Sequence, residues 1–327
     1  MTKIYTDKSF DIEKFIKEHA RLETGQRYYR IFHCAFYLCL LPRNIKEDVL
    51  NIFSRETKSA FNSILNIDQE FCQSIDECDY VLLPPDDIGD SKTDILIQWT
   101  PLIREAKQAG KKIIVMLGMD DDVPFPIQPE LGIVFRSSGF LSESTENIKG
   151  LPTVNSDLYH GTYLPKKLSI GFCGLVWEDI EDRVDLIGSF MDQLYEECNF
   201  ILRDQWSGNG PIQNRMEYFQ NLNENLYCLC ARGGGNFSFR FGETLMMGRI
   251  PILLNTDCIL PFRESIPYET NCIMLTKDDL PNIGKIVTDF HDRHSEEELI
   301  KIQKENRLLW EEYFTPEGIF NHIIRML

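Results

Sequence analysis

The residue types best suited to chemistry are concentrated in one short segment, Arg232–Leu245, which reads RGGGNFSFRFGETL. It contains three successive glycines: Gly233, Gly234 and Gly235. They allow a tight turn and a close approach of a ligand to the backbone. Asn236 and Ser238 are residue types that cap helices, so we expect a helix to begin at about Ser238. The N–H groups and the dipole of a helix start favour phosphate, so the segment indicates a phosphate site.

Two arginines and one glutamate accompany this turn. Arg232 precedes the glycines and Arg240 lies in the first turn of the expected helix, where both can reach the same anion. Glu243 follows Arg240 by three residues and shares its helix face. A carboxylate weakens phosphate binding unless it binds the hydroxyl groups of an attached ribose or sugar. The layout therefore indicates a nucleotide-sugar site, with a plain glycine turn and a surface Arg–Glu pair as the alternative.

Other functional classes are disfavoured. The sequence has no GxxxxGK[ST] segment, and no GxGxxG follows the first expected strand, which argues against P-loop proteins and Rossmann dehydrogenases. The chain has 34 Lys plus Arg against 51 Asp plus Glu, a net charge of −17. Such a negative field repels phosphate backbones, so we expect no nucleic-acid partner.

The run Leu229–Phe262 resembles the exostosin family of glycosyltransferases. The family pattern is an arginine before a glycine-containing turn, then Ser-x-Arg-x-x-Glu, an apolar helix, Gly-x-Ile-Pro and a Pro-Phe after the next strand. The residues that match it here are Arg232, Gly233, Gly235, Ser238, Arg240, Glu243, Gly248, Ile250, Pro251, Pro261 and Phe262. Weaker similarity extends over residues 78–327, and the residues before it match no pattern that we can name.

The resemblance implies an α/β protein of the GT-B type, in which two Rossmann-like domains face across a cleft. The C-terminal domain would bind the nucleotide-sugar donor, mostly a UDP-sugar in this family, and the N-terminal domain a glycan acceptor. Arg232 and Arg240 would hold the diphosphate and Glu243 the ribose or donor sugar. The glycines, Asn236 and Ser238 would line the phosphate loop. Transfer would invert the anomeric configuration, and no metal would be obligatory, because arginines and a helix dipole can stabilise the leaving diphosphate.

An inverting transfer also needs a general base that takes the proton of the acceptor hydroxyl. Asp120 is the leading candidate, because it follows the expected strand Lys112–Leu117, where members of the family often carry an acidic residue. The alternative is that Asp120–Asp122 is a solvated acidic turn. His160 and Glu178 are further candidates for the base.

Apolar runs and helix signals alternate on both sides of an irregular segment, residues 150–167, which we interpret as a linker. The expected strands are Tyr80–Leu83, Lys112–Leu117, Leu131–Phe135, Leu168–Cys173, Tyr227–Cys230, Ile250–Asn255 and Ile273–Leu275. The expected helices are Asp94–Ala109, Val184–Glu197, Ser238–Met247 and residues 281–293, 296–313 and 316–326. We predict an acceptor-binding domain over residues 1–165 and a donor-binding domain over residues 166–305. By the resemblance, terminal helices at residues 306–327 pack back on the N-terminal domain.

Neither a signal peptide nor a transmembrane segment is expected. Residues 1–15 carry frequent charges, and the longest uncharged apolar stretch, Ile31–Pro42, is shorter than the ~20 residues of a membrane span. The ten cysteines show no CxxC or zinc-finger spacing, which is typical of free thiols in a reducing compartment. We therefore expect a cytoplasmic glycosyltransferase. A pseudoenzyme that binds nucleotide or glycan, or another sugar-nucleotide enzyme such as an epimerase, is the alternative.

Overall fold

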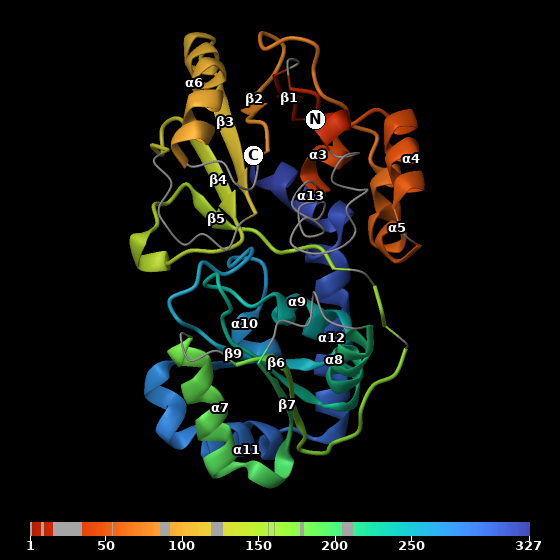
Figure 1. Cartoon of the computed structure of the whole chain (residues 1–327), viewed down its shortest axis with the longest axis vertical. Helices are drawn as coiled ribbons and strands as arrows, with labels where there is room; N and C mark the ends of the chain where they lie inside the picture. Colours follow the sequence, from red (N-terminus) through yellow and green to blue (C-terminus); the bar gives the residue numbers. More distant parts are fainter. Residues whose placement is uncertain are drawn as a thin grey trace.

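Two parallel β-sheets form the protein, one above the other (Figure 1). The computed structural model describes residues 2–7, 10–15, 35–53, 55–85, 92–118, 127–155, 157–159, 161–176, 180–204 and 212–327. Each sheet has five strands, and all neighbouring strands within it are parallel. Parallel sheets are covered on both faces, which explains why their strands are nearly continuous apolar runs.

The N-terminal sheet has the strand order β1-β2-β3-β4-β5. Its strands are β1 (Ile4–Tyr5), β2 (Tyr80–Leu82), β3 (Lys112–Leu117), β4 (Gly132–Arg136) and β5 (Ile148–Gly150). The helices of this half are α3 (Ala35–Cys39), α4 (Arg43–Ile52), α5 (Arg55–Phe61) and α6 (Lys92–Gln108). β3 and β4 end at the same level, because Leu117 pairs with Arg136. Ser138, two residues beyond β4, already contacts the second domain through the amide of Asn236.

The C-terminal sheet has the strand order β10-β9-β8-β6-β7. Its strands are β6 (Ile170–Leu175), β7 (Cys198–Arg203), β8 (Tyr227–Cys230), β9 (Ile250–Leu254) and β10 (Ile273–Leu275). Its helices are α7 (Glu181–Gln193), α8 (Ile212–Glu224), α9 (Phe239–Met246), α10 (Tyr268–Asn271), α11 (Ile283–Arg293) and α12 (Glu296–Tyr313). From β6 the chain runs outward to β7 and then returns across β6 to β8. The strand order therefore reverses between β6 and β8, and ligands of open α/β sheets bind at the carboxyl ends of strands at such a reversal.

The predicted fold class is confirmed, since the chain forms two Rossmann-like α/β halves in the GT-B arrangement. The expected bounds of β3, β10 and α12 agree with the structure, as do those of the last helix, α13 (Pro316–Met326). Elements that were not expected from the sequence include β1, β5, β7, α8 and α10.

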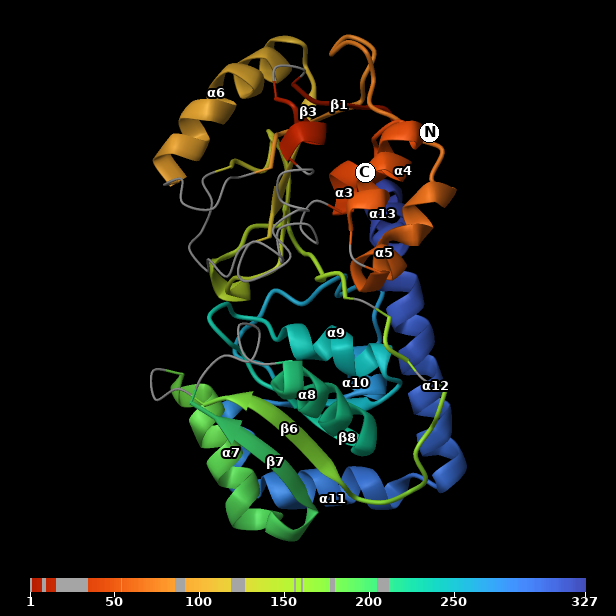
Figure 2. The ribbon, with the colours of Figure 1, turned by 45° about the vertical axis from the view of Figure 1, so that its right-hand side comes forward.

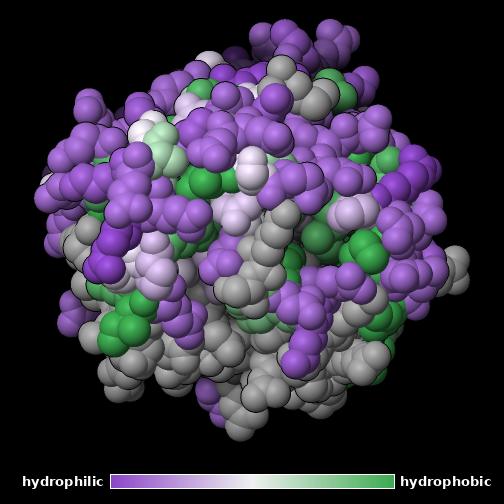
Figure 3. All heavy atoms as spheres, turned by 90° about the horizontal axis from the view of Figure 1, so that it is seen from above, coloured by the Kyte–Doolittle hydropathy of each residue, from purple (hydrophilic) through white to green (hydrophobic). Residues whose placement is uncertain are grey.

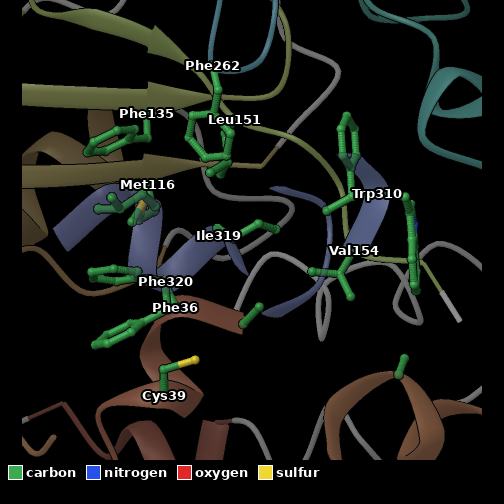
Figure 4. Close-up of a cluster of buried hydrophobic side chains, with 14 of the residues drawn as sticks. Phe36, Cys39, Met116, Phe135, Leu151, Val154, Phe262, Trp310, Ile319 and Phe320 are labelled. Atoms are coloured by element: carbon green, nitrogen blue, oxygen red, sulfur yellow. The ribbon is translucent and has the colours of Figure 1, made fainter. Parts of the chain in front are cut away.

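The two halves share one buried apolar cluster (Figure 4). Met116 and Phe135 enter it from the N-terminal sheet, and Phe36 enters it from α3. Phe262 and Trp310 belong to the C-terminal half and lie in the same cluster. Burial of these large side chains is the main contribution that holds the two halves together.

Helices α12 and α13 carry the chain from the C-terminal sheet back to the N-terminal half (Figure 2). α13 packs on α3, where the ring centroids of Phe36 and Phe320 are 5.3 Å apart. Tyr80 of β2 donates a hydrogen bond from its hydroxyl to the carbonyl of Leu327 at 2.5 Å. The last residue is thus fixed on the N-terminal sheet.

The surface seen from above the N-terminal half is largely hydrophilic, with scattered hydrophobic side chains (Figure 3). Large exposed apolar side chains include Ile97 on α6 and Leu308 on α12. Within the described residues, no helix has the length and apolar character needed to cross a membrane.

Candidate functional site

Arg240 occupies the reversal of strand order in the C-terminal sheet. From the first turn of α9 its Nη1 donates to the carbonyl of Leu229 at 3.2 Å, and its Nη2 donates to the carbonyl of Cys173 at 2.8 Å. These two carbonyls lie near the carboxyl ends of β8 and β6. The guanidinium carbon is 4.3 Å from the ring centroid of Phe172 and 5.4 Å from that of Tyr218. The sequence-predicted arginine is therefore held rigidly at the place where open α/β sheets bind ligands.

Arg183, near the start of α7, is a second cation at this reversal of strand order. Its Nη1 donates to the carbonyl of Leu175 at 2.7 Å, and its Nη2 donates to the carbonyl of Arg232 at 2.5 Å. Burial, followed by the positive charge of Arg240, lowers the pKa of Arg183 to about 10. Within the described residues, neither Arg183 nor Arg240 forms an ion pair with a carboxylate. Glu243 interacts electrostatically with Arg240, and the two neighbouring guanidinium groups together favour a bound anion.

Glu243 turns toward Tyr218 of α8 rather than forming an ion pair. The Tyr218 hydroxyl donates a hydrogen bond to the carboxylate of Glu243. Burial raises the pKa of Glu243, while this hydrogen bond and the charge of Arg240 oppose that rise. Tyr218 thus contacts both charged residues of the motif, Arg240 through its ring and Glu243 through its hydroxyl.

Tyr218→Phe is expected to lower the free energy of unfolding by about 1.5–3 kcal/mol, because it leaves a buried carboxylate without its hydrogen-bond donor. Urea unfolding measures the change. Tyr195→Phe is the matched control, since Tyr195 is 64% exposed, and its free energy of unfolding should stay within about 0.5 kcal/mol of the parent. Equal effects of the two substitutions would show that the Tyr218–Glu243 contact contributes nothing.

A pocket of about 350 Å³ lies beside the glycine-rich turn. Asn255, Thr256 and Thr276, which lie just beyond β9 and β10, line this pocket. Arg232 and Phe140 of the N-terminal half also line it. The Arg232 guanidinium carbon is 5.5 Å from the centroid of the Phe140 ring. The pocket is therefore lined by polar side chains that suit a hydroxylated ligand, by one aromatic ring, and by the cation Arg232 beside the glycine-rich turn. Its other charged lining residues are Asp182, Lys277 and Asp278.

The remaining residues of the turn have more structural roles. Ser238 is the N-cap residue of α9, as expected, although in the described part of the chain its side chain accepts no capping hydrogen bond. Gly233, Gly234 and Gly235 connect β8 to this helix start. Asn236 is fully buried, and its side-chain amide donates hydrogen bonds to the carbonyls of Thr256 and of Gly139 in the N-terminal half. Its role as a lining residue of the phosphate loop stays a prediction, and its observed contacts are with the domain junction.

The predicted general base, Asp120, lies outside the described residues, as do His160 and Glu178. β3, which precedes Asp120, ends at Leu117 beside the end of β4. Over the same described ranges, no group of three or more His, Cys, Asp or Glu side chains is placed to hold a metal ion.

Comparisons find known proteins that are similar to this chain. Residues 180–290 match the Exostosin GT47 domain. A protein of Oryza sativa subsp. japonica named probable glucuronosyltransferase is 32% identical over 71 residues, which cover 22% of this chain and 17% of that protein. An exostosin-1 homolog of Caenorhabditis elegans is 29% identical over 125 residues, which cover 38% of this chain and 32% of the homolog. The solved structure of a glycosyltransferase from Rickettsia africae has a TM-score of 0.43 at 11% identity, covering 99% of this chain and 97% of that one.

The domain match includes Arg183, the glycine-rich turn, Arg240 and Glu243, which are the residues that the C-terminal sheet brings together. This chain spans only a part of the curated relatives, because the matches cover 17% and 32% of their lengths. The resemblance found in the sequence is confirmed over residues 180–290, which match the Exostosin GT47 domain.

Proposed function

We propose that the protein is an inverting glycosyltransferase that moves a sugar from a UDP-sugar to a hydroxyl group of a glycan acceptor. The C-terminal sheet, within residues 166–305, binds the donor, and the N-terminal half, residues 1–165, binds the acceptor. The observation that carries this proposal is the pair of half-buried arginines, Arg183 and Arg240, at the reversal of strand order next to the glycine-rich turn. The names of the relatives as glycosyltransferases support it.

In this reaction the acceptor oxygen attacks the anomeric carbon while the bond from that carbon to the diphosphate breaks. Negative charge then develops on the diphosphate oxygens. Guanidinium groups that are already fixed by main-chain carbonyls stabilise this charge without reorganising. Glu243 binds a hydroxyl of the ribose or of the donor sugar, and no metal is required for leaving-group departure.

The proton of the acceptor hydroxyl passes to a carboxylate, for which we propose Asp120. Asp120→Asn is expected to reduce transfer by about 100-fold or more, because an amide cannot accept this proton, while UDP affinity stays unchanged. Transfer to an acceptor glycan and UDP binding are measured on the same preparation. Asp122→Asn is the matched control in the same acidic run and should retain full activity. Full transfer by Asp120→Asn would place the base elsewhere.

The proposed function is tested with a panel of UDP-, GDP-, CMP- and TDP-sugars, for which thermal stabilisation and slow donor hydrolysis are measured. A ligand that binds only the native state raises the melting temperature. We expect stabilisation by UDP and UDP-sugars, together with release of UDP. Absence of any nucleotide effect would overturn the donor-site assignment. Binding without turnover, with acceptor glycans supplied, would instead identify a pseudoenzyme.

A further inference from the structure

We propose that Phe140 of the N-terminal half completes the donor pocket by stacking on the nucleobase, and that Asn236 is the positioning residue that holds Phe140 there. The nucleotide would then bind to both halves of the molecule in a site assembled before it arrives. This inference rests on the proposed function, because it assigns a nucleotide to the pocket beside the glycine-rich turn.

Asn236 connects the glycine-rich turn both to the N-terminal half, through Ser138 and Gly139, and to Thr256 after β9. Its main-chain N–H donates to the Oγ of Ser138 at 2.5 Å. Its Nδ2 donates to the carbonyls of Gly139 at 3.2 Å and Thr256 at 2.9 Å, and its Oδ1 accepts from the Oγ1 of Thr256 at 2.5 Å. The residue is 0% exposed, so each of these bonds is shielded from water.

The segment that carries Phe140 is further held by the loop that follows β9. The main-chain N–H of Leu141 donates to the carbonyl of Asp257 at 2.8 Å, and that of Ser142 donates to the Asp257 carboxylate at 3.0 Å. Phe140 itself forms an antiparallel bridge with Cys258. The two residues that flank Phe140 are therefore fixed to the donor domain on both sides, Gly139 by Asn236 and Leu141 by Asp257.

Phe140 is only partly buried, and it lines the pocket together with Asn255 and Thr256. Arg232 lies against the same ring at 5.5 Å and belongs to the start of the glycine-rich turn. A nucleobase is flat and aromatic, and stacks readily on such a ring. With the diphosphate at Arg183 and Arg240, the nucleoside would extend past Arg232 into this pocket, which Arg232 lines. The N-terminal half thus supplies one wall of a pocket that otherwise belongs to the C-terminal sheet.

The test is a double-mutant cycle on UDP binding, with Kd measured by calorimetry for the parent, Phe140→Ala, Asn236→Ala and the double variant. We expect about a 10-fold loss of UDP affinity for Phe140→Ala, which is the size of one lost base stack. Asn236→Ala should lose a similar factor, because the Phe140 loop is released. If Asn236 acts through Phe140, the double variant should bind UDP as tightly as the single variant with the lower affinity.

Three results separate the possible outcomes. If the loss of UDP affinity in the double variant equals the product of the two single losses, Asn236 does not act through Phe140. Unchanged affinity in Phe140→Ala would overturn the stacking role, while UDP binding by the parent would leave the proposed function in place. A parent that binds no UDP would overturn the proposed function itself. Should Asn236→Ala fold poorly, Ser138→Ala removes the hydroxyl that accepts from the Asn236 main-chain N–H, and this variant enters the same cycle.

Discussion

Arg240→Ala is expected to reduce the affinity for UDP by about 100-fold, the largest effect on ligand binding of any single substitution considered for this protein. The side chain is held at the carboxyl ends of β6 and β8 by carbonyls of Cys173 and Leu229. Its charge interacts with Glu243 without forming an ion pair in the described part of the chain, and Arg183 adds a second positive charge, so a bound diphosphate would be a further counter-ion. Hydrogen bonds between a guanidinium and phosphate are charge-assisted and strong, which sets the size of the loss.

Two further variants make this result interpretable. Arg240→Lys keeps the charge but loses the planar geometry that bridges both strands, so an intermediate affinity is expected. Arg263→Ala removes the same charge from an exposed ion pair with Glu269 that does not line the pocket, and should bind UDP like the parent. Calorimetry gives the Kd, and urea unfolding checks that each variant is folded. Parent-like affinity in a folded Arg240→Ala protein would remove this arginine from the site.

Gly150→Ala is expected to destabilise the protein by about 3 kcal/mol or more, the largest effect on stability. Gly150 ends β5 and bridges Pro261 of the C-terminal half. A Cβ atom there would lie 2.3 Å from the carbonyl oxygen of Leu260 and 2.7 Å from the nitrogen of Pro261. These are backbone atoms, so relief of the clash requires the β5 edge and the loop after β9 to separate.

Gly188→Ala is the matched control for this substitution. Gly188 lies inside α7, and no heavy atom would come within 4 Å of its added Cβ. Since alanine favours a helix over glycine, this variant should gain up to about 1 kcal/mol. Urea unfolding of both variants gives the comparison. A Gly150→Ala protein as stable as the parent would mean that the two halves are not in close contact at this bridge.

The elements that could be predicted from the sequence are those whose apolar pattern or capping residue lies within the element itself. β3 and β10 are uninterrupted apolar runs, and α12 begins at the capping residue Ser295, whose side chain accepts from the amide of Glu298. β7 escaped prediction because it is an edge strand whose residues are half-exposed, so it shows no continuous apolar run. α8 also escaped prediction, because its apolar periodicity is weak and its buried residues are only Asn221 and Leu222.

The candidate site divides in the same way. Arg232, Arg240 and Glu243 were predicted because they share one motif. Arg183 and Tyr218 were not, because only the β6–β8 crossover brings them to Arg240. The contacts of Asn236 with Ser138 and Gly139 join positions 98 and 97 residues apart, and no local pattern indicates such a pairing.

We propose that Arg183 and Arg240, at the carboxyl ends of β6 and β8, bind the nucleotide of a sugar donor together with the pocket beside the glycine-rich turn. A crystal structure of the protein with saturating UDP tests it most directly. We expect the diphosphate to lie within hydrogen-bond distance of the Arg183 or Arg240 guanidinium and the uracil ring to lie against Phe140. UDP bound elsewhere, with neither these arginines nor the pocket in contact with it, would contradict the proposed donor site.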